Sequence, residues 1–326
     1  MMKVLITRRI PQIGMDILSE FADLDIWEED SAIPRDEFLG RLVGKDAVIC
    51  LLSDRMDAEA MESGSELKVI GNYAVGYDNI DVEEATRRGI PVLNTPGVLT
   101  DATADLAFAL ILSAARRIPE GDRYIRAGKF KTWGPRLMLG KDLSGMTLGV
   151  IGAGKIGSAV LRRARGFGMD LAYNSRTKNK GLEEELGARF LEKDRILREA
   201  DIISLNCPLT EDTYHLIGER ELSMMKDDAV LVNTSRGPVV DEKALYRALK
   251  EDRIHSAGLD VFENEPEVFP PLMELDNVIM VPHIGSATVR TRDKMAEMVS
   301  RGITDVIQGR IPPNLVNPDT MKEKGA

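Results

Sequence analysis

Three polar residues in the second half of the chain could together reduce a carbonyl group. Arg236, Glu265 and His283 each follow, within several residues, a short apolar run that is typical of a buried strand. A guanidinium can hold a substrate carboxylate through two parallel hydrogen bonds and polarise a carbonyl. An imidazolium can protonate the carbonyl oxygen as hydride reaches the carbon, and a neighbouring carboxylate favours the charged imidazole. We therefore predict that His283 is the acid/base, Glu265 its partner, and Arg236 the group that binds the carboxylate of a 2-keto acid.

The chain has three histidines, and only one of them follows the end of an apolar run directly. We expect His215 to be a structural residue at the edge of a loop and His255 to be exposed before a strand. A satisfied structural histidine is also the simpler alternative for His283, and surface charges are the simpler alternatives for Arg236 and Glu265 taken singly. The occurrence of all three at successive strand ends favours catalysis, because ligands of open α/β sheets bind beyond those ends.

A glycine-rich turn, GAGKIG at residues 152–157, predicts a dinucleotide-binding site. It follows the apolar run Thr147–Ile151 and precedes a helix that we expect over Ser158–Phe167. The first glycine permits a tight turn, the second lets backbone amides approach a pyrophosphate, and the third lets helix and strand pack closely. The helix N-terminus also favours negative charge. An ordinary glycine-rich turn between strand and helix is the simpler alternative.

The residues after the second strand of this segment bear on the choice of cofactor. An NAD-binding chain usually has an acid about 20 residues after the turn, where it holds the 2′-hydroxyl. Here the strand is expected to end at Tyr173 and is followed by Asn174, Ser175, Arg176 and Thr177. A guanidinium flanked by hydroxyls suits a 2′-phosphate better. We therefore expect NADPH to be favoured over NADH, with use of both as the alternative if Arg176 is only a solvated loop residue.

The elements that must position these residues alternate almost from end to end. Short apolar runs, which are typical of buried parallel strands, are separated by helix-length amphipathic segments, and this pattern predicts α/β architecture. The expected strands are Lys3–Thr7, Ala47–Leu52, Val69–Tyr73, Ile90–Asn94, Thr147–Ile151, Leu171–Tyr173, Ile202–Asn206, Val230–Asn233, Ser256–Leu259 and Val278–Val281.

The alternation breaks once, after the Thr-Pro-Gly at residues 95–97, where a long helical stretch replaces the next strand. We therefore expect two doubly wound parallel-sheet domains with a cleft between them. Residues 1–97 and 286–326 form a flavodoxin-like substrate-binding domain, and residues 98–285 form a Rossmann dinucleotide-binding domain. The last helix, expected over Ala287–Gly309, crosses back to pack on the first domain.

Composition excludes several other classes of protein. The 326 residues include 43 basic and 53 acidic side chains, a net charge of −10, so a nucleic-acid partner is not expected. The two cysteines, Cys50 and Cys207, lie in apolar runs and form no CxxC spacing, so we expect no disulfide framework, no metal site and a reducing cytoplasm. No apolar stretch approaches about 18 residues, so no membrane partner is expected.

Several motifs resemble those of the D-isomer-specific 2-hydroxyacid dehydrogenases, especially the glyoxylate/hydroxypyruvate reductase branch. They are NYAVGYDNID at residues 72–81, the glycine turn, NTSRG at 233–237, LDVFENEP at 259–266 and PHIG at 282–285, and the resemblance covers nearly all of residues 1–315. It implies an oxidoreductase that reduces glyoxylate or hydroxypyruvate to glycolate or D-glycerate. It also implies the same roles for Arg236, Glu265 and His283.

The resemblance further implies which residues line the two binding sites. Asp260 would contact the nicotinamide carboxamide, and the backbone amides of Val75 and Gly76 would hold the substrate carboxylate, although a purely structural turn is the simpler alternative. The expected cofactor-binding residues are Thr103, Gly152, Ala153, Gly154, Lys155, Ile156, Gly157, Ser175, Arg176, Thr177, Cys207, Thr234, Ser235, Asp260 and Gly285. The expected substrate-binding residues are Leu52, Val75, Gly76, Arg236 and His283.

The same resemblance implies a homodimer. The apolar stretch Leu106–Ala115 is expected to join the two-fold interface. Trp133 is expected either to limit substrate size in the partner's pocket or to pack in a core or an interface.

Two other functions stay open on the sequence. The first is a nicotinamide-sensing binding protein, since the family also contains corepressors with the same three residues; those have long disordered tails, whereas this chain ends shortly after Asn317. The second is the same chemistry on another D-2-hydroxy acid, such as phosphoglycerate, or on formate or an aryl pyruvate. Glyoxylate and hydroxypyruvate differ by one small group, which a pocket discriminates weakly.

Overall fold

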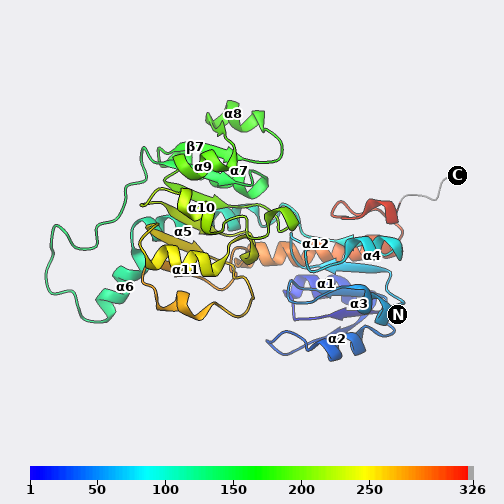
Figure 1. Cartoon of the computed structure of the whole chain (residues 1–326). Helices are drawn as coiled ribbons and strands as arrows, with labels where there is room; N and C mark the ends of the chain where they lie inside the picture. The colour runs from blue at the N-terminus through cyan, green and yellow to red at the C-terminus, as the bar shows by residue number, and fades with distance from the viewer. Residues whose placement is uncertain (322–326) are drawn as a thin grey trace. The chain divides into compact units, whose positions relative to one another are not determined.

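The computed structural model describes residues 1–321, which fold as two compact units. Unit 1 comprises residues 1–99 and, within the described part of the chain, 286–321, and unit 2 comprises Thr100–Gly285. Each unit is built on one sheet in which every strand pair is parallel, with helices on both faces (Figure 1). The predicted class, two parallel-sheet α/β domains, is confirmed. None of the helices within residues 1–321 is long and apolar enough to cross a membrane.

Unit 1 has a five-stranded sheet in the order β2-β1-β3-β4-β5, the order of flavodoxin-like sheets. Its strands are β1 (Met2–Ile6), β2 (Ala22–Ile26), β3 (Ala47–Cys50), β4 (Val69–Asn72) and β5 (Val92–Leu93). Its helices are α1 (Gln12–Ser19), α2 (Arg35–Leu42), α3 (Ala58–Ser63), α4 (Val82–Arg87) and α12 (Val289–Ile307). Buried side chains of α2, α3 and α4 pack on one face of the sheet.

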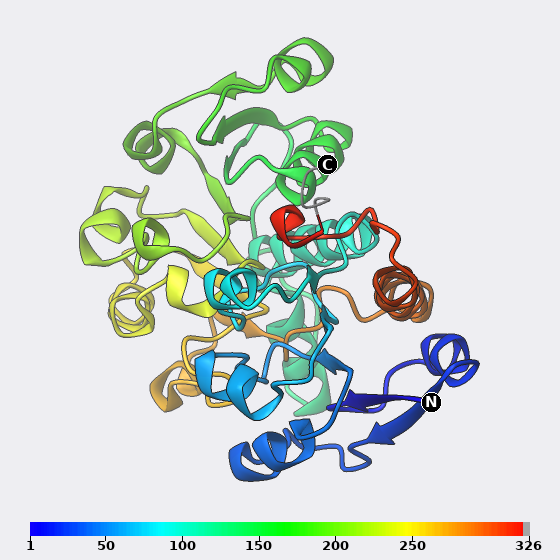
Figure 2. The same ribbon diagram turned by 90° about the vertical axis from the view of Figure 1, so that its right-hand side faces the viewer.

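The last helix of the chain returns to unit 1 and covers the other face of its sheet. α12 packs against α1 and β4, and the two helices lie side by side in both views (Figure 1, Figure 2). The hydroxyl of Tyr73 donates a hydrogen bond of 2.7 Å to the carbonyl of Arg292. A Cβ added to Gly71 would lie 2.7 Å from Cγ2 of Val299, so the strand must present a glycine where the helix crosses it.

Unit 2 has a seven-stranded sheet in the order β12-β11-β10-β9-β6-β7-β8. Its strands are β6 (Thr147–Ile151), β7 (Asp170–Asn174), β8 (Arg189–Phe190), β9 (Ile202–Leu205), β10 (Val230–Asn233), β11 (Ser256–Leu259) and β12 (Val278–Met280). The direction in which successive strands are added reverses between β6 and β9, and ligands of open α/β sheets bind at such a switch point, beyond the carboxyl ends of the strands.

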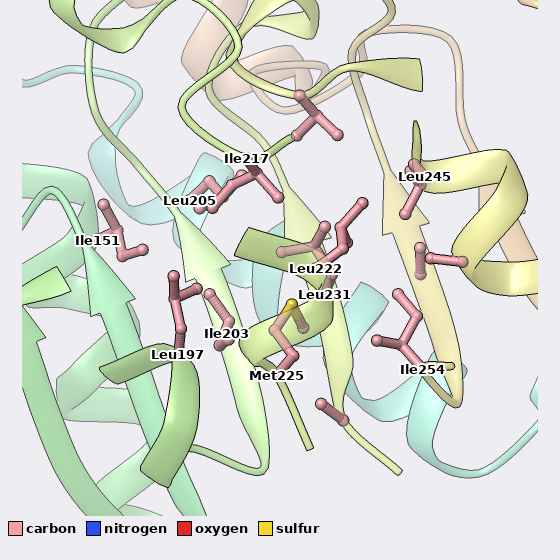
Figure 3. Packing of buried hydrophobic residues seen from close by; sticks show 14 of the residues in the cluster. Ile151, Leu197, Ile203, Leu205, Ile217, Leu222, Met225, Leu231, Leu245 and Ile254 are labelled. Atoms are coloured by element: carbon pink, nitrogen blue, oxygen red, sulfur yellow. The ribbon is translucent and has the colours of Figure 1, made fainter. Parts of the chain in front are cut away.

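Seven α-helices belong to unit 2. They are α5 (Thr100–Ala115), α6 (Ile118–Arg126), α7 (Lys155–Gly166), α8 (Lys180–Leu186), α9 (Lys193–Glu199), α10 (Glu219–Met224) and α11 (Glu242–Lys250). α5 and α7 cover one face of the sheet, and α9, α10 and α11 cover the other. Figure 3 shows the second of these cores, in which Leu197, Leu222 and Leu245 from the helices pack on Ile203 and Leu231 from the strands. These apolar faces fix the strands whose ends carry the site.

Several predicted element boundaries were wrong. β2 and β8 were not predicted at all, and both are edge strands of their sheets. α7 begins at Lys155 rather than at Ser158, because the last glycine of the turn already belongs to the first turn of the helix. α5, which begins at Thr100, is the long helical stretch that the sequence predicted after residues 95–97.

Candidate active site

Three adjacent strands of unit 2 bring Arg236, Glu265 and His283 to one edge of the sheet. The three residues follow β10, β11 and β12 respectively, and these strands are neighbours, so their carboxyl ends lie at the same edge. Nδ1 of His283 lies 2.8 Å from Oε2 of Glu265. About a third of each side chain is exposed, 31% for the histidine and 35% for the glutamate, so a small molecule can reach the pair.

The surroundings of Glu265 hold it in its ionised form. Burial by itself raises the pKa of this carboxyl, but the hydrogen bond and charge of His283 and the positive charge of Arg236 oppose burial. The backbone amide of Phe262 also donates to Oε1, at 2.9 Å. The net result is a pKa for Glu265 below its ordinary value. An ionised carboxylate can accept a hydrogen bond from Nδ1–H of His283 and so stabilise the imidazolium form.

The turn that carries Arg236 is fixed from within. The buried side chain of Asn233 donates to the carbonyl of Arg236 at 2.9 Å and accepts from the amide of Ser235 at 3.0 Å and from its hydroxyl at 2.7 Å. The next residue, Gly237, lies against the loop after β11, and a Cβ there would collide with the carbonyl of Phe262. The turn of Arg236 and the loop of Glu265 are therefore in direct backbone contact.

Asp260 ties the segment of His283 to the end of β11. Its carboxylate accepts hydrogen bonds from the amides of Ile284, at 2.6 Å, and Gly285, at 2.9 Å, and its carbonyl accepts one from the amide of His283 at 2.9 Å. Burial raises the pKa of Asp260 to about 6, although the two amides and the charge of His283 act in the opposite direction. A Cβ on Gly285 would lie 3.3 Å from Cγ2 of Thr103, so Thr103 belongs to the same cluster.

The glycine turn after β6 forms an open cradle at the start of α7. Gly152 has a positive φ of 94°, and the carbonyl of Asn174 accepts hydrogen bonds from its amide and from that of Ala153. A Cβ on Gly154 would meet no atom within 4 Å, whereas one on Gly157 would collide with the carbonyl of Gly152. The open space lies at a helix N-terminus, where a phosphate is stabilised. The turn therefore fits the pyrophosphate of a dinucleotide.

Two buried polar atoms at the carboxyl ends of neighbouring strands have no hydrogen-bond partner among the described residues: Oγ1 of Thr234 and Oδ1 of Asn206. They follow β10 and β9, and the backbone of Asn206 and Cys207 packs directly on Gly152. A buried polar atom without a partner is costly, so a ligand that bonds to it is favoured. The residues present thus fit a bound dinucleotide. Asn206 was not among the predicted cofactor residues, although its place at the end of an apolar run was a usable signal.

The loop after β7 places the predicted 2′-phosphate residues on the surface. The hydroxyl of Ser175 donates to the carbonyl of Thr177 at 2.6 Å, while Arg176 is exposed. The side chain of Asn174 donates to the carbonyl of Leu191 at 2.9 Å, so it ties β7 to the chain after β8. Within residues 1–321 no ion pair is formed by Arg176, whose guanidinium faces solvent.

The predicted substrate residues of unit 1 lie at the carboxyl ends of β3 and β4. Leu52 is in the turn after β3, and Val75 and Gly76 are in the turn after β4. The carbonyls of Val75 and Gly76 accept hydrogen bonds from the side chains of Asn94, at 2.8 Å, and Asn72, at 2.7 Å. In the described part of the chain, neither amide of this pair has a protein acceptor.

The structure contradicts the expected exposure of His255 and excludes one of the alternatives for Trp133. His255 was expected to be exposed but is half-buried, with Nε2 buried, because the C-terminal end of α5 lies beside the start of β11. Trp133, in the segment between α6 and β6, has 76% of its surface exposed, so it does not pack in the core of this chain.

Comparison with known proteins finds relatives over the whole chain. Residues 108–285 match the family model described as D-isomer specific 2-hydroxyacid dehydrogenase, NAD binding domain. A glyoxylate reductase of Thermococcus litoralis is 52% identical over 323 residues, 98% of each chain. The structure of an NADPH-dependent glyoxylate/hydroxypyruvate reductase from Sinorhizobium meliloti, in complex with NADP and malonate, matches with a TM-score of 0.87 at 30% identity, over 100% of this chain and 99% of that one. A D-lactate dehydrogenase from Aquifex aeolicus, complexed with NAD and lactic acid, matches with a TM-score of 0.86 at 30% identity, over 97% of this chain and 99% of that one.

Proposed function

Since the chain belongs to the D-isomer-specific 2-hydroxyacid dehydrogenases, in the glyoxylate reductase branch, and is an NAD(P)-dependent oxidoreductase, we propose that it reduces glyoxylate or hydroxypyruvate to glycolate or D-glycerate, with NADPH as the favoured cofactor. The observation that carries the proposal is the contact of 2.8 Å between His283 and Glu265 beside Arg236, at the edge that also holds the glycine cradle. The 52% identity to a glyoxylate reductase supports the substrate.

Each member of the triad has a role that follows from its contacts. The nicotinamide, when bound, supplies hydride to the keto carbon. Arg236 binds the carboxylate and polarises the carbonyl oxygen. Because Nδ1 of His283 is engaged by Glu265, Nε2 is the atom that gives its proton to that oxygen. Ionised Glu265 stabilises the imidazolium before the transfer and holds the ring in place during it.

The turn of Val75 and Gly76 is proposed to bind a substrate carboxylate. Their carbonyls are bonded to asparagine side chains, and their amides have no acceptor in the described residues. Successive backbone amides of this kind form a nest that suits an anion. Leu52, after the neighbouring strand, is proposed to line the substrate site.

The preference for NADPH rests on the loop after β7. Asn174 stands where an NAD enzyme has its acid, and its side chain is bonded to Leu191, while Arg176 is exposed beside two hydroxyl residues. The compared structures contain NADP in one relative and NAD in another, so the loop is the observation that favours NADPH.

Steady-state assays with NADPH and NADH against glyoxylate, hydroxypyruvate and pyruvate test this function. We expect a higher kcat/KM with NADPH, and the Arg176→Ala variant should lose roughly tenfold with NADPH and little with NADH, because a charge-assisted hydrogen bond to the phosphate is removed. A wild-type preference for NADH contradicts the cofactor proposal. Binding of NADPH without its oxidation by any keto acid favours the nicotinamide-sensing alternative.

A homodimer and a cytoplasmic location complete the proposal. Most of the predicted dimer stretch, Leu106–Ala115, is already buried within unit 2, where α5 packs against α7, β10 and β11. We therefore place the interface in the following segment, and its exposed large apolar residues are Ile118, Ile125, Phe130, Trp133, Leu137 and Leu139. The two cysteines are unpaired and buried, which suits a reducing compartment.

A further inference from the structure

The loop that carries His215 makes a hydrogen-bonded contact with the loop that carries Glu265. His215 lies between β9 and α10, and its Nε2 is 2.8 Å from Oε1 of Glu263. Its φ is 48°, in the left-handed region that a non-glycine residue seldom adopts. Such a conformation persists only where the surroundings hold it, and residues in this conformation are concentrated at functional sites.

Glu263 in turn exchanges hydrogen bonds with the start of α11. The amide of Glu263 donates to Oε1 of Glu242 at 2.8 Å, and the amide of Glu242 lies 3.4 Å from Oε2 of Glu263. Glu242 is only 5% exposed, and burial, with the charges of Glu263 and Glu265, raises its pKa. Three carboxyl groups are thus gathered around one loop, and the imidazole of His215 is the hydrogen-bond partner of the middle one.

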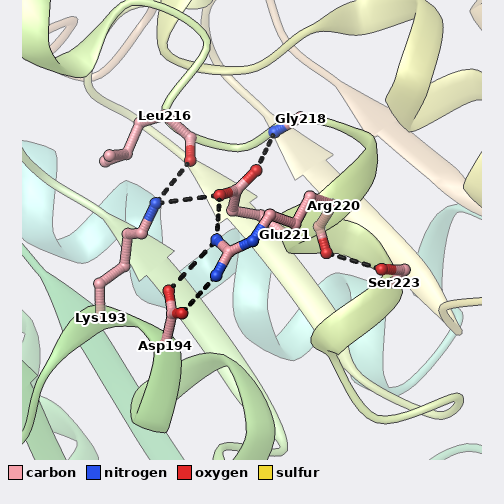
Figure 4. Close-up of polar contacts among 7 residues, drawn as sticks. All are labelled: Lys193, Asp194, Leu216, Gly218, Arg220, Glu221 and Ser223. Atoms are coloured by element: carbon pink, nitrogen blue, oxygen red, sulfur yellow. Dashed lines mark hydrogen bonds and ion pairs between the residues drawn. The ribbon is translucent and has the colours of Figure 1, made fainter.

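The backbone around His215 is anchored to the rest of unit 2. Its amide donates to the carbonyl of Pro238 at 2.8 Å, and Ile217 forms a parallel bridge with Val240. Figure 4 shows a second anchor on the same segment. There Nζ of Lys193 reaches the carbonyl of Leu216, and Glu221, which it also contacts at 3.1 Å, accepts from the amide of Gly218. The segment that carries His215 is therefore fixed to the rest of unit 2, so the contact between His215 and Glu263 can restrain the loop of Glu263.

The loop that His215 holds touches two members of the triad. Phe262 precedes Glu263, and its amide donates to Oε1 of Glu265 at 2.9 Å. Its carbonyl lies against Gly237, the residue after Arg236. A displacement of Glu263 would therefore move the group that orients Glu265, and through Glu265 the imidazole of His283.

We propose that His215 is a positioning residue of the reaction, which holds the loop of residues 262–265 through Glu263 so that Glu265 stays bonded to His283. The proposal deepens the proposed function and rests on it for its kinetic consequences. His215 touches neither substrate nor cofactor in this account, and it acts through Glu263 alone.

The matched variants are His215→Leu and His215→Gln. Neither replacement is branched at Cβ at this left-handed position, but only glutamine carries an Nε2 donor that can reach Oε1 of Glu263. We expect His215→Leu to lower kcat by roughly tenfold with a small effect on the dissociation constant of NADPH, because one hydrogen bond to a charged group is lost. His215→Gln should restore most of the rate. Equal rates for all three proteins, or equal losses in both variants, overturn the proposal.

A second measurement does not need turnover. The chain has three histidines, so the imidazole NMR signals of His283 can be assigned by substitution. We expect them to shift in His215→Leu and in Glu263→Gln but to stay close to wild type in His215→Gln. If the wild type reduces no keto acid, the proposed function fails while these signals still decide the coupling. Unchanged His283 signals in both disruptive variants overturn the inference even in an active enzyme.

Discussion

At the scale of the residue, the site keeps two carboxyls in opposite electrostatic surroundings. Glu265 faces His283 and Arg236, and its pKa lies below the ordinary value, whereas burial raises that of Asp260 to about 6. Environments that push the pKa values of neighbouring groups apart are typical of sites that separate chemical roles. Here the ionised carboxyl serves the imidazole and the buried one holds the backbone of the same segment.

The raised pKa of Asp260 makes a prediction about stability. Ionisation of Asp260 opposes folding. The stability contributed by its protonated form is therefore complete below the unfolded-state pKa of 3.8 and is lost as the pH rises toward 6. Between pH 4 and 6, the free energy of unfolding of the wild type should therefore fall by about 2 kcal/mol relative to Asp260→Asn. Urea unfolding across this range measures the difference, and Asp170→Asn, at an exposed position, controls for the lost charge. Parallel profiles for wild type and Asp260→Asn contradict the assignment.

Arg236 supplies a kinetic prediction. Arg236→Ala should reduce kcat/KM for glyoxylate, because a desolvated carboxylate loses its charged partner. The reduction should correspond to a loss of roughly 3–5 kcal/mol of transition-state stabilisation. Arg236→Lys should recover only part of this, since an ammonium cannot form the two parallel bonds. The dissociation constant of NADPH, measured by fluorescence, should change little. Near-normal kcat/KM in Arg236→Ala removes this residue from the mechanism.

The sequence predicted the positions of Arg236, Glu265 and His283 because polar residues that follow buried parallel strands must share an edge. It could not predict that Nδ1, rather than Nε2, of His283 faces Glu265, which depends on the turn conformation around a residue with a φ of 49°. Nor could it connect His215 with Glu263, since they are 48 residues apart and neither follows a strand directly.

At the scale of the element, the central strands were predictable and the edges were not. β10 is apolar until its last residue because helices cover both faces of the sheet, so it appears in the sequence as an unbroken run. β2 contains Asp23 and Asp25, whose charges interrupt such a run, and β8 has only two residues. The order of the strands, and with it the switch point between β6 and β9, depends on packing that short runs do not encode.

The glycine turn gives a matched pair of predictions at this scale. Gly154→Ala adds a methyl group to open space, so its thermal stability should equal that of the wild type, while NADPH binding should weaken because the methyl group occupies the phosphate cradle. Gly157→Ala should lower the melting temperature itself, since the methyl group collides with the carbonyl of Gly152. Calorimetry with and without NADPH measures both. Wild-type affinity in Gly154→Ala contradicts the proposed place of the pyrophosphate.

At the scale of the whole molecule, the exposed apolar residues are concentrated where they could be covered by a second copy. α6 has no buried residue, and Ile125 and Phe130 are 58% and 50% exposed. Scattered apolar side chains need no explanation, but a run of them over one segment is typical of an interface. The two-fold dimer implied by the sequence therefore stays a prediction, now placed on residues 118–139.

Light scattering of the wild type and two variants tests this placement. We expect the mass of a dimer for the wild type and a monomer for Ile125→Glu, because a buried unpaired carboxylate is costly at an interface. Val289→Glu, at a residue of α12 that is 82% exposed, should remain a dimer. A monomeric wild type, or a dimeric Ile125→Glu, rejects the proposed interface.

The central claim is that the triad directs hydride from the nicotinamide to the C2 atom of a small 2-keto acid. The most direct test is NMR analysis of the product formed from glyoxylate and NADPH deuterated at the transferred position of C4. We predict one deuteron at C2 of glycolate with the wild-type protein, and none with His283→Ala, which should still bind NADPH. No deuterated product from the wild type, or undiminished transfer by His283→Ala, would contradict the account.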